Sequence, residues 1–280
     1  MEPSTADNAE TIDLALARAT LYSALALGFR SPTEETITRL GSQDAVAALA
    51  SAAALLDPTR EFDLAAVSSL LTPYSSLLTL AEAHRALFGH TASAAVPPYE
   101  TEYGNEALFQ QPQELGDLMG FYNAFGLTLN CAAHERLDHI SCECEFLSFL
   151  AMKEAYALEH SDGEMLVETR KAERLFLRDH LARFLPAFAN TLVRTTNPHP
   201  YPLPLGEGEG EGDFHGFYRA LAKLGLKFIA AECARFGVPA GAENLTLRPA
   251  DDDRVPMACG SGTECTALPG ACMPEGADSV

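Results

Sequence analysis

The stretch IDLALARATLYSALALGF, residues 12–29, decides the fold class of this chain. Its apolar side chains recur every three or four positions, which is the spacing of one buried face of an α-helix. The residues on that face are Leu14, Ala17, Leu21, Leu25 and Phe29. The same spacing returns in segments up to about residue 236, whereas the alternation typical of β-strands is scarce. The sequence therefore predicts one all-α domain of about eight to ten helices over residues 12–237.

Capping residues mark several of the expected helix ends. Ser31 is predicted to be an N-cap, followed by a proline at the first helical position and the capping-box residue Glu34, and Gly41 closes that helix. Asp138 is predicted to be the N-cap of a long helix that continues to about His160. Further helices are expected at residues 45–56, 63–71, 74–88, 112–125, 164–180, 181–195 and 213–236.

Three segments are expected to lie outside these helices. Residues 1–11 precede the first helical pattern, and residues 238–280 are rich in Pro, Gly and Asp, so both are predicted to be disordered. Residues 197–212 alternate prolines with other residues and then glycines with glutamates, which predicts a flexible acidic insertion in the domain. The tail also contains the irregularly spaced cysteines Cys259, Cys265 and Cys272.

The charge balance restricts the classes of partner. The 280 residues include 19 basic and 39 acidic side chains, giving a net charge of −20. Such a chain repels nucleic-acid phosphates and anionic membranes and attracts cationic partners. The N-terminus has no basic region followed by an apolar run, and the longest apolar tract, residues 45–56, is too short to cross a bilayer. Together with an odd number of cysteines, seven, these features predict a cytoplasmic protein without stable membrane insertion.

The sequence contains no recognisable catalytic signature, so the chain is predicted not to be an enzyme. It has neither a phosphate-binding P-loop nor the Gly-x-Ser-x-Gly turn of a serine hydrolase. Cys131, His134, His139 and Cys142 have ligand-like spacing and leave open a metal-binding helical enzyme or sensor as an alternative. However, a zinc site normally draws two well-separated ligand pairs, and these four residues surround a single helix start. We therefore expect neither a metal nor another cofactor.

Two stretches combine carboxylates with aromatic or apolar side chains near predicted helix ends. The first is VPPYETEY, residues 96–103, which follows a helix that ends in LFGH, residues 87–90. The second is LDHISCECEFL, residues 137–147, at the start of the long helix. Carboxylates can accept guanidinium groups in a two-point fashion, and tyrosines present flat amphipathic surfaces. The combination favours binding of a positively charged, partly apolar peptide.

In their order and separation these stretches resemble the TorD/DmsD/NarJ family of redox-enzyme maturation chaperones. That family combines a Leu-Phe-x-Gly-like helix end, a Pro-x-Tyr/Glu-x-x-Tyr loop and a Pro-Asp-His-Leu helix entry followed by Glu-Phe-Leu. Two positions depart from this pattern, because Leu137 stands where the family has proline and Thr101 where it often has serine. The resemblance implies a cytoplasmic chaperone that binds the N-terminal, often twin-arginine, segment of the catalytic subunit of a molybdenum-cofactor oxidoreductase. It would hold that subunit until cofactor insertion and assembly or export.

The resemblance also implies a set of peptide-binding residues. These are Pro98, Tyr99, Glu100, Tyr103, Asp138, His139 and Glu145. Glu143 and Glu145 are two residues apart on a helix and point to different sides, so only Glu145 is assigned to the groove. Simpler interpretations remain open: Asp138 and His139 as a helix cap, Glu145 as a solvated surface residue, and the chain as a general acidic adaptor.

Overall fold

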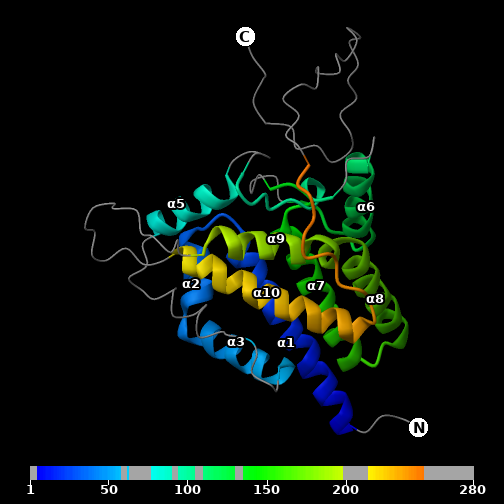
Figure 1. Ribbon diagram of the computed structural model, residues 1–280. Helices are drawn as coiled ribbons and strands as arrows, with labels where there is room; N and C mark the ends of the chain where they lie inside the picture. Colours follow the sequence, from blue (N-terminus) through cyan, green and yellow to red (C-terminus); the bar gives the residue numbers. More distant parts are fainter. Residues whose placement is uncertain are drawn as a thin grey trace, which may run out of the picture.

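The structure, a computed structural model, describes residues 5–57, 62, 77–89, 94–104, 110–129, 135–197 and 214–248. In these residues the regular elements are helices, and two isolated β-bridges are the only extended pairing (Figure 1). The predicted all-α fold class is therefore confirmed. The α-helices are α1 (Thr5–Phe29), α2 (Glu34–Gly41), α3 (Gln43–Leu56), α5 (Leu77–Phe88), α6 (Gln110–Ala124), α7 (Ile140–Glu159), α8 (Gly163–Phe176), α9 (Ala182–Thr195) and α10 (Phe214–Phe236).

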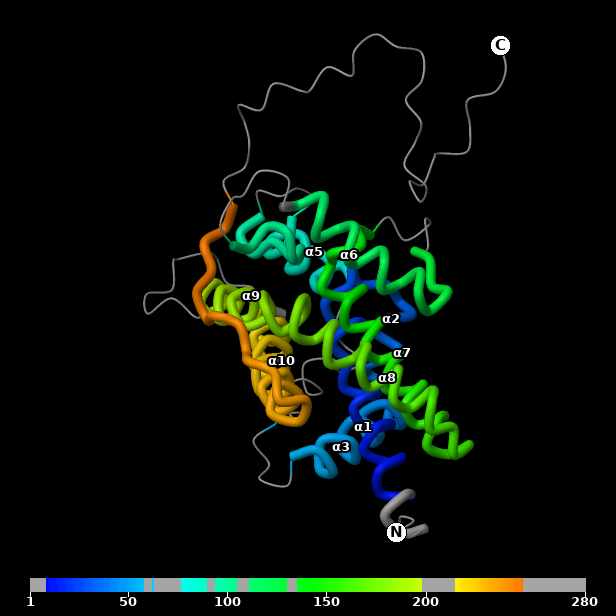
Figure 2. Tube along the Cα trace, turned by 90° about the vertical axis from the view of Figure 1, so that its right-hand side faces the viewer, coloured from blue at the N-terminus to red at the C-terminus, as the bar shows by residue number. Residues whose placement is uncertain are grey.

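The helices α1 and α7 pack against each other at the centre of the molecule. The Ser148 hydroxyl on α7 donates a hydrogen bond to the carbonyl oxygen of Ala19 on α1, at 2.9 Å. Helices α9 and α10 cover one face of this pair, and α3 packs on α1 from another side (Figures 1 and 2). The stretch Ala9–Phe29 of α1 is long and apolar enough to cross a membrane, but 67% of its most apolar part is buried inside the molecule.

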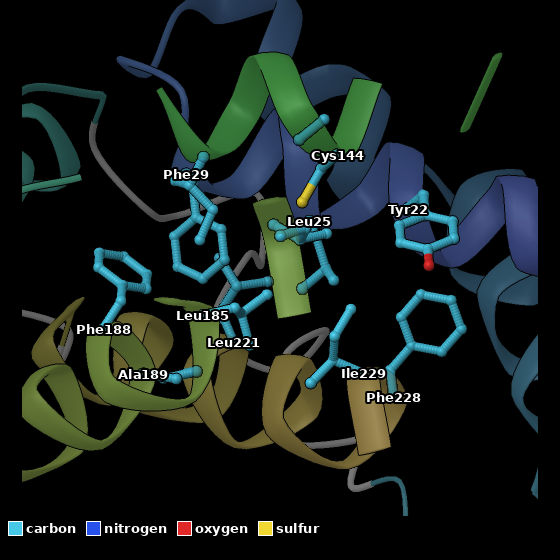
Figure 3. Close-up of a cluster of buried hydrophobic side chains, with 14 of the residues drawn as sticks. Tyr22, Leu25, Phe29, Cys144, Leu185, Phe188, Ala189, Leu221, Phe228 and Ile229 are labelled. Carbon is cyan, nitrogen blue, oxygen red and sulfur yellow. The ribbon is translucent and has the colours of Figure 1, made fainter. Parts of the chain in front are cut away.

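The main core fills the space between α1 and α7 on one side and α9 and α10 on the other (Figure 3). Figure 3 shows Leu25 and Phe29 of α1 facing Leu185 of α9 and Leu221 of α10. Helix α1 approaches α10 closely at Gly28, where a Cβ atom would lie 2.5 Å from Cδ2 of Leu221. Glycine at this position therefore allows the two helices to pack together.

The first helices begin at positions that differ from the expected ones. Helix α1 starts at Thr5, so part of the segment 1–11 that was predicted to be disordered is helical. The N-cap of α2 is Thr33 rather than Ser31, because the Thr33 hydroxyl oxygen accepts the backbone N–H of Thr36. Ser42 lies between α2 and α3 and caps the start of α3. A β-hydroxyl two residues further along the chain thus competes successfully for the cap.

Helices α8 and α9 form one continuous helical run rather than two separate helices. A π-helical segment, Leu177–Leu181, joins them. Pro186 follows in α9 and has no N–H to donate to the carbonyl oxygen of Ala182. That oxygen instead accepts the backbone N–H of Gly241, at 2.8 Å. A segment that follows α10 in the chain therefore supplies the hydrogen bond that the proline cannot make.

That segment, residues 238–248, is named here the C-terminal strap. It runs from the end of α10 along α9 (Figure 2). A Cβ atom at Gly241 would lie 2.1 Å from the carbonyl oxygen of Arg183, so only glycine can pass there. The strap thus continues the described part of the chain to Arg248 and contacts the helical domain beyond residue 237. The predicted helix 63–71, most of the acidic insertion 197–212 and the tail cysteines lie outside the described residues.

Candidate functional site

The loop formed by residues 94–104 is held along both of its edges by backbone hydrogen bonds. On one edge, the N–H of Ile140 donates to the carbonyl of Pro98, and the N–H of Glu100 donates to the carbonyl of Asp138. On the other edge, Gly104 donates to Thr246 of the C-terminal strap, and Arg248 of the strap donates to Glu102. The loop therefore joins the entry to α7 with the C-terminal strap.

Glu100 is fully buried beneath the loop and is bound by side chains from the π-helical segment and α9. Its Oε1 accepts from Arg183 Nη2 at 2.5 Å, and its Oε2 lies 3.0 Å from Nδ1 of His180. His180 at the end of the π-helical segment and Arg183 in α9 are three residues apart and share one side of the helical run, so both reach the same carboxylate. A buried carboxylate needs such partners because an unpaired charge in the interior is costly.

Asp138 is also fully buried, and its carboxylate does not cap α7. Oδ2 accepts the Thr101 hydroxyl at 2.7 Å and Nη2 of Arg136 at 2.9 Å, while Oδ1 accepts Nε of the same arginine at 3.0 Å. Asp138 therefore binds the loop and a neighbouring arginine in the bidentate geometry typical of such pairs.

The N-cap of α7 is His139, one residue later than predicted. Its Nδ1 accepts the backbone N–H of Ser141 at 3.1 Å, so the proton of the neutral ring belongs on Nε2, which faces Glu135 at 3.6 Å. Burial lowers the pKa of His139 to about 3, with smaller contributions from His84, Arg30 and Arg136. The ring therefore stays neutral at ordinary pH, which a hydrogen-bond acceptor at a cap requires. Assigning the cap to Asp138 and the first turn to His139 was wrong, because the imidazole nitrogen replaced the usual oxygen.

The tyrosines of the loop have different environments. Tyr103 is buried, and its hydroxyl donates to the carbonyl of Pro97 at 2.9 Å. Tyr99 is half-buried, with the guanidinium carbon of Arg136 4.2 Å above its ring and His139 against its edge. Pro98 is buried beside it. Tyr99 is therefore the member of this group that retains an accessible face.

The two glutamates at the start of α7 lie on different sides of the helix. Glu143 is fully buried, and no described residue donates a hydrogen bond to either of its carboxylate oxygens. Burial, reinforced by Glu100 and Asp138, raises its pKa well above the usual range, which favours the neutral form of the side chain. Glu145 is exposed and forms an ion pair at 2.6 Å with Arg30, the residue that follows the end of α1. The spacing argument thus separated the two side chains correctly.

Glu145 opens onto a groove of about 480 Å³, which we call the α1–α7 groove. Its walls come from α1, α7 and the segment after α6, and most of the side chains are apolar or aromatic. The apolar residues include Leu27, Leu127, Leu129, Phe149 and Met152. Glu135, Glu145, Arg30 and Arg39 contribute charges to the same lining. Burial raises the pKa of Glu135.

Of the predicted peptide-binding residues, only Glu145 lines the α1–α7 groove. Pro98, Tyr99, Glu100, Tyr103, Asp138 and His139 lie together in the neighbouring loop junction, which consists of residues 94–104 with Arg136, Asp138, His139, His180 and Arg183. The groove residues were missed, although Cys142, Glu145, Phe149 and Met152 recur at three- and four-residue intervals along α7. This spacing places the four residues on one face of α7, so it could have predicted the face that lines the groove.

The proposed metal ligands are only partly visible. Cys131 and His134 lie outside the described residues. His139 uses Nδ1 for its cap, and burial raises the pKa of the Cys142 thiol to about 12. Within the described part of the chain, no three His, Cys, Asp or Glu side chains are grouped so that they could hold a metal ion.

Comparison with known proteins gives consistent similarities. The family model described as nitrate reductase delta subunit matches residues 43–190, just over half of the chain. The perchlorate reductase assembly chaperone protein of Dechloromonas aromatica is 30% identical over 181 residues, which cover 63% of this chain and 78% of that protein. The chaperone protein TorD of Vibrio cholerae serotype O1 is 28% identical over 217 residues, which cover 76% of this chain and 88% of that protein. A chlorate reductase assembly chaperone protein of Ideonella dechloratans is 40% identical over 81 residues, 29% of this chain and 41% of that protein.

Proposed function

This chain belongs to the nitrate reductase delta subunit family of redox-enzyme maturation chaperones, and on that basis we propose that it binds the catalytic subunit of a molybdenum oxidoreductase. In this proposal it recognises the N-terminal, often twin-arginine, segment of that subunit. It acts in the cytoplasm, holds the subunit until cofactor insertion and assembly or export, and catalyses no reaction itself.

The α1–α7 groove is the observation that carries the proposal. Its apolar walls suit a short amphipathic helix, since such ligands place apolar side chains at three- and four-residue intervals into a hydrophobic groove. Met152 is half exposed at the edge of the groove, and Phe149 lies one helical turn away on the same helix. The apolar stretch of a client segment would pack against these side chains.

The charged end of the groove suits an arginine. Glu145 is 64% exposed, and its partner Arg30 is 31% exposed. Exposed ion pairs contribute little stability, so an incoming guanidinium can replace Arg30 at Glu145 at small cost. The net charge of −20 adds long-range attraction for a cationic segment. We therefore assign Glu145 the direct contact, with Glu135 as a second acceptor.

The remaining predicted residues have a different role in this proposal. Glu100 and Asp138 are already bound by Arg183 and Arg136, so they are not free to receive a client arginine. They fix the loop and the entry to α7, from which Glu145 projects. Tyr99, whose face is partly accessible, is proposed to contact the client at the border between junction and groove.

A labelled-peptide titration tests this assignment. The probe is a fluorescent peptide that contains two consecutive arginines followed by an apolar stretch, and anisotropy is measured at increasing salt. We expect binding to weaken as salt rises, and Glu145→Lys to weaken it by at least about tenfold, because an ion pair with arginine becomes a repulsion. Met152→Asp is expected to weaken it as well, by placing a charge in the apolar wall.

Glu159→Lys provides the matched control, because it makes the same charge change at an exposed position on the same helix. This variant should bind within about twofold of the original protein, since exposed charges interact weakly. If Glu145→Lys and Glu159→Lys weaken binding equally, Glu145 contributes only through the net charge of the protein and not through a direct contact. Affinity independent of salt and of both groove variants would contradict the groove as the binding site and favour a general adaptor.

A further inference from the structure

Helix α8 meets the end of α10 beside α7 (Figure 1). A second cavity lies at this junction and is lined by residues of all three helices. We call it the α8–α10 pocket. Its volume is about 670 Å³, within the range of small-molecule sites. Four of its seven lining residues are cationic: Arg170, Lys171, Arg174 and Arg235. The whole chain has only 19 basic residues against 39 acidic ones, so this concentration of positive charge contrasts with the rest of the molecule.

The buried charges beneath the pocket do not supply negative charge to its surface. Arg18 is fully buried and is bound by Glu154, Glu173 and Glu232. Glu154 also accepts Nε of Arg170 at 2.7 Å. Burial raises the pKa of Glu173 to about 8, so at pH 7 this carboxyl is mostly protonated. Arg18 and Arg170 therefore balance the carboxylates of Glu154 and Glu232, and the third carboxyl group, Glu173, is shifted toward its uncharged form.

Three cations remain at the mouth of the pocket. Lys171 has the exposed Glu168 at 3.4 Å as its partner, an interaction of little energy. Arg174 uses Nε to donate to the carbonyl of Phe236 at 3.2 Å, which leaves its terminal nitrogens for another acceptor. Arg235 forms no ion pair with a described residue. Since Arg170 and Arg174 are four residues apart on α8, their like charges also repel each other.

We propose that the α8–α10 pocket binds a phosphate-bearing small molecule. A guanidinium group offers paired donors that match two phosphate oxygens, and a tetrahedral phosphate can accept from two such groups at once. Arg174 on α8 and Arg235 on α10 approach the pocket from different helices, which is the arrangement that two-sided binding requires. Leu175 and Phe236 give the rest of the lining an apolar surface for the non-phosphate part.

The site is independent of the client-peptide groove. Glu154, at this pocket, and Met152, at the groove, are two residues apart on α7 and point to different sides of the helix. The phosphate proposal can therefore fail without affecting the peptide proposal, and the reverse also holds.

Titration calorimetry of the full chain with inorganic phosphate and pyrophosphate tests the proposal. We expect saturable binding, tighter for pyrophosphate, because it offers more oxygens to the two guanidinium groups. Arg174→Gln combined with Arg235→Gln should weaken pyrophosphate binding by at least about tenfold, since each charge-assisted hydrogen bond contributes more than a neutral one. The single variant Arg235→Gln removes no hydrogen bond or ion pair to a described residue, so it should fold normally and weaken binding in the same direction.

Arg85→Gln combined with Lys223→Gln is the matched control. Both side chains are exposed and neither lines the pocket, and Lys223 lies twelve residues before Arg235 on α10, so this pair removes the same charge elsewhere. Binding should stay within about twofold of the original protein. The proposal is overturned if no saturable heat is seen, if chloride or acetate at equal ionic strength competes as well as phosphate, or if both pairs of substitutions have the same effect.

Discussion

The loop junction and the α1–α7 groove adjoin each other on α7, yet they hold their charges in opposite ways. In the junction, Glu100 and Asp138 are buried and fully occupied by Arg183 and Arg136. In the groove, Glu145 is largely exposed and has a single, accessible partner. Buried pairs are costly to break, whereas exposed pairs exchange partners readily. The difference indicates that the junction maintains the shape of the site and the groove is free to bind.

The largest effect on stability is expected at Glu100. Replacement by alanine leaves the guanidinium of Arg183 and the ring of His180 without their buried acceptor. Removing one partner of a buried ion pair typically costs about 3–5 kcal/mol. Urea denaturation of Glu100→Ala should therefore show a loss of this order, and a loss below about 1 kcal/mol would contradict a structural role for the junction.

A pH-dependent effect is expected from His139. The pKa of this group is lowered from 6.5 to about 3 in the folded state, so the unfolded chain binds a proton that the folded chain does not. The resulting stability is complete above pH 6.5 and is lost as the pH falls toward 3, by up to about 1.4 kcal/mol per pH unit. His139→Asn keeps an N-cap acceptor and should give a shallower slope in thermal unfolding over this range. An unchanged slope would show that other groups dominate.

A smaller effect is expected at Tyr103. Phenylalanine at this position removes the hydroxyl that donates to the carbonyl of Pro97, within a buried loop. The loss of one such hydrogen bond costs about 1 kcal/mol. Tyr156→Phe, at a half-exposed position on α7, serves as the control and should leave the unfolding midpoint unchanged. Equal midpoints for both variants would place the Tyr103 hydroxyl outside the stabilising network.

The smallest effect on stability is expected at Glu145. Glu145→Gln removes an exposed ion pair with Arg30 and should change the free energy of unfolding by less than about 0.5 kcal/mol. The same variant should lower the affinity for the arginine-containing peptide, whereas Tyr103→Phe should affect the stability of the protein more than its peptide binding. If Glu145→Gln unfolds the protein as readily as Glu100→Ala, the distinction between junction and groove fails.

Several features of the fold followed directly from the sequence. The apolar spacing predicted the end of α1, and the turn after residue 160 predicted the boundary between α7 and α8 within one residue, because both depend on local patterns. The two-residue separation of Glu143 and Glu145 also predicted correctly that they face different sides. Short-range geometry of a helix is enough for such conclusions.

Other features depended on partners distant in the chain. Glu100 and Asp138 are carboxylates of the kind that could bind an arginine of a peptide. However, Glu100 already binds Arg183, which is 83 residues away in the chain. The N-cap of α7 moved by one residue because the Asp138 carboxylate was drawn to Thr101 and Arg136, which left the cap to His139. No local sequence pattern predicts that His139 rather than Asp138 caps α7.

The sequence by itself determined that the chain is all-helical, acidic and similar to a chaperone family, since periodicity, net charge and motif order are properties of the linear chain. Only the tertiary structure decided which carboxylates are available. A buried carboxylate is costly unless it is paired with a cation. Packing of the loop against α9 and α7 buries Glu100 and Asp138, so both form ion pairs with arginines of the same chain. The same packing left Glu145 at the open edge of a groove, where its charge remains free to exchange partners.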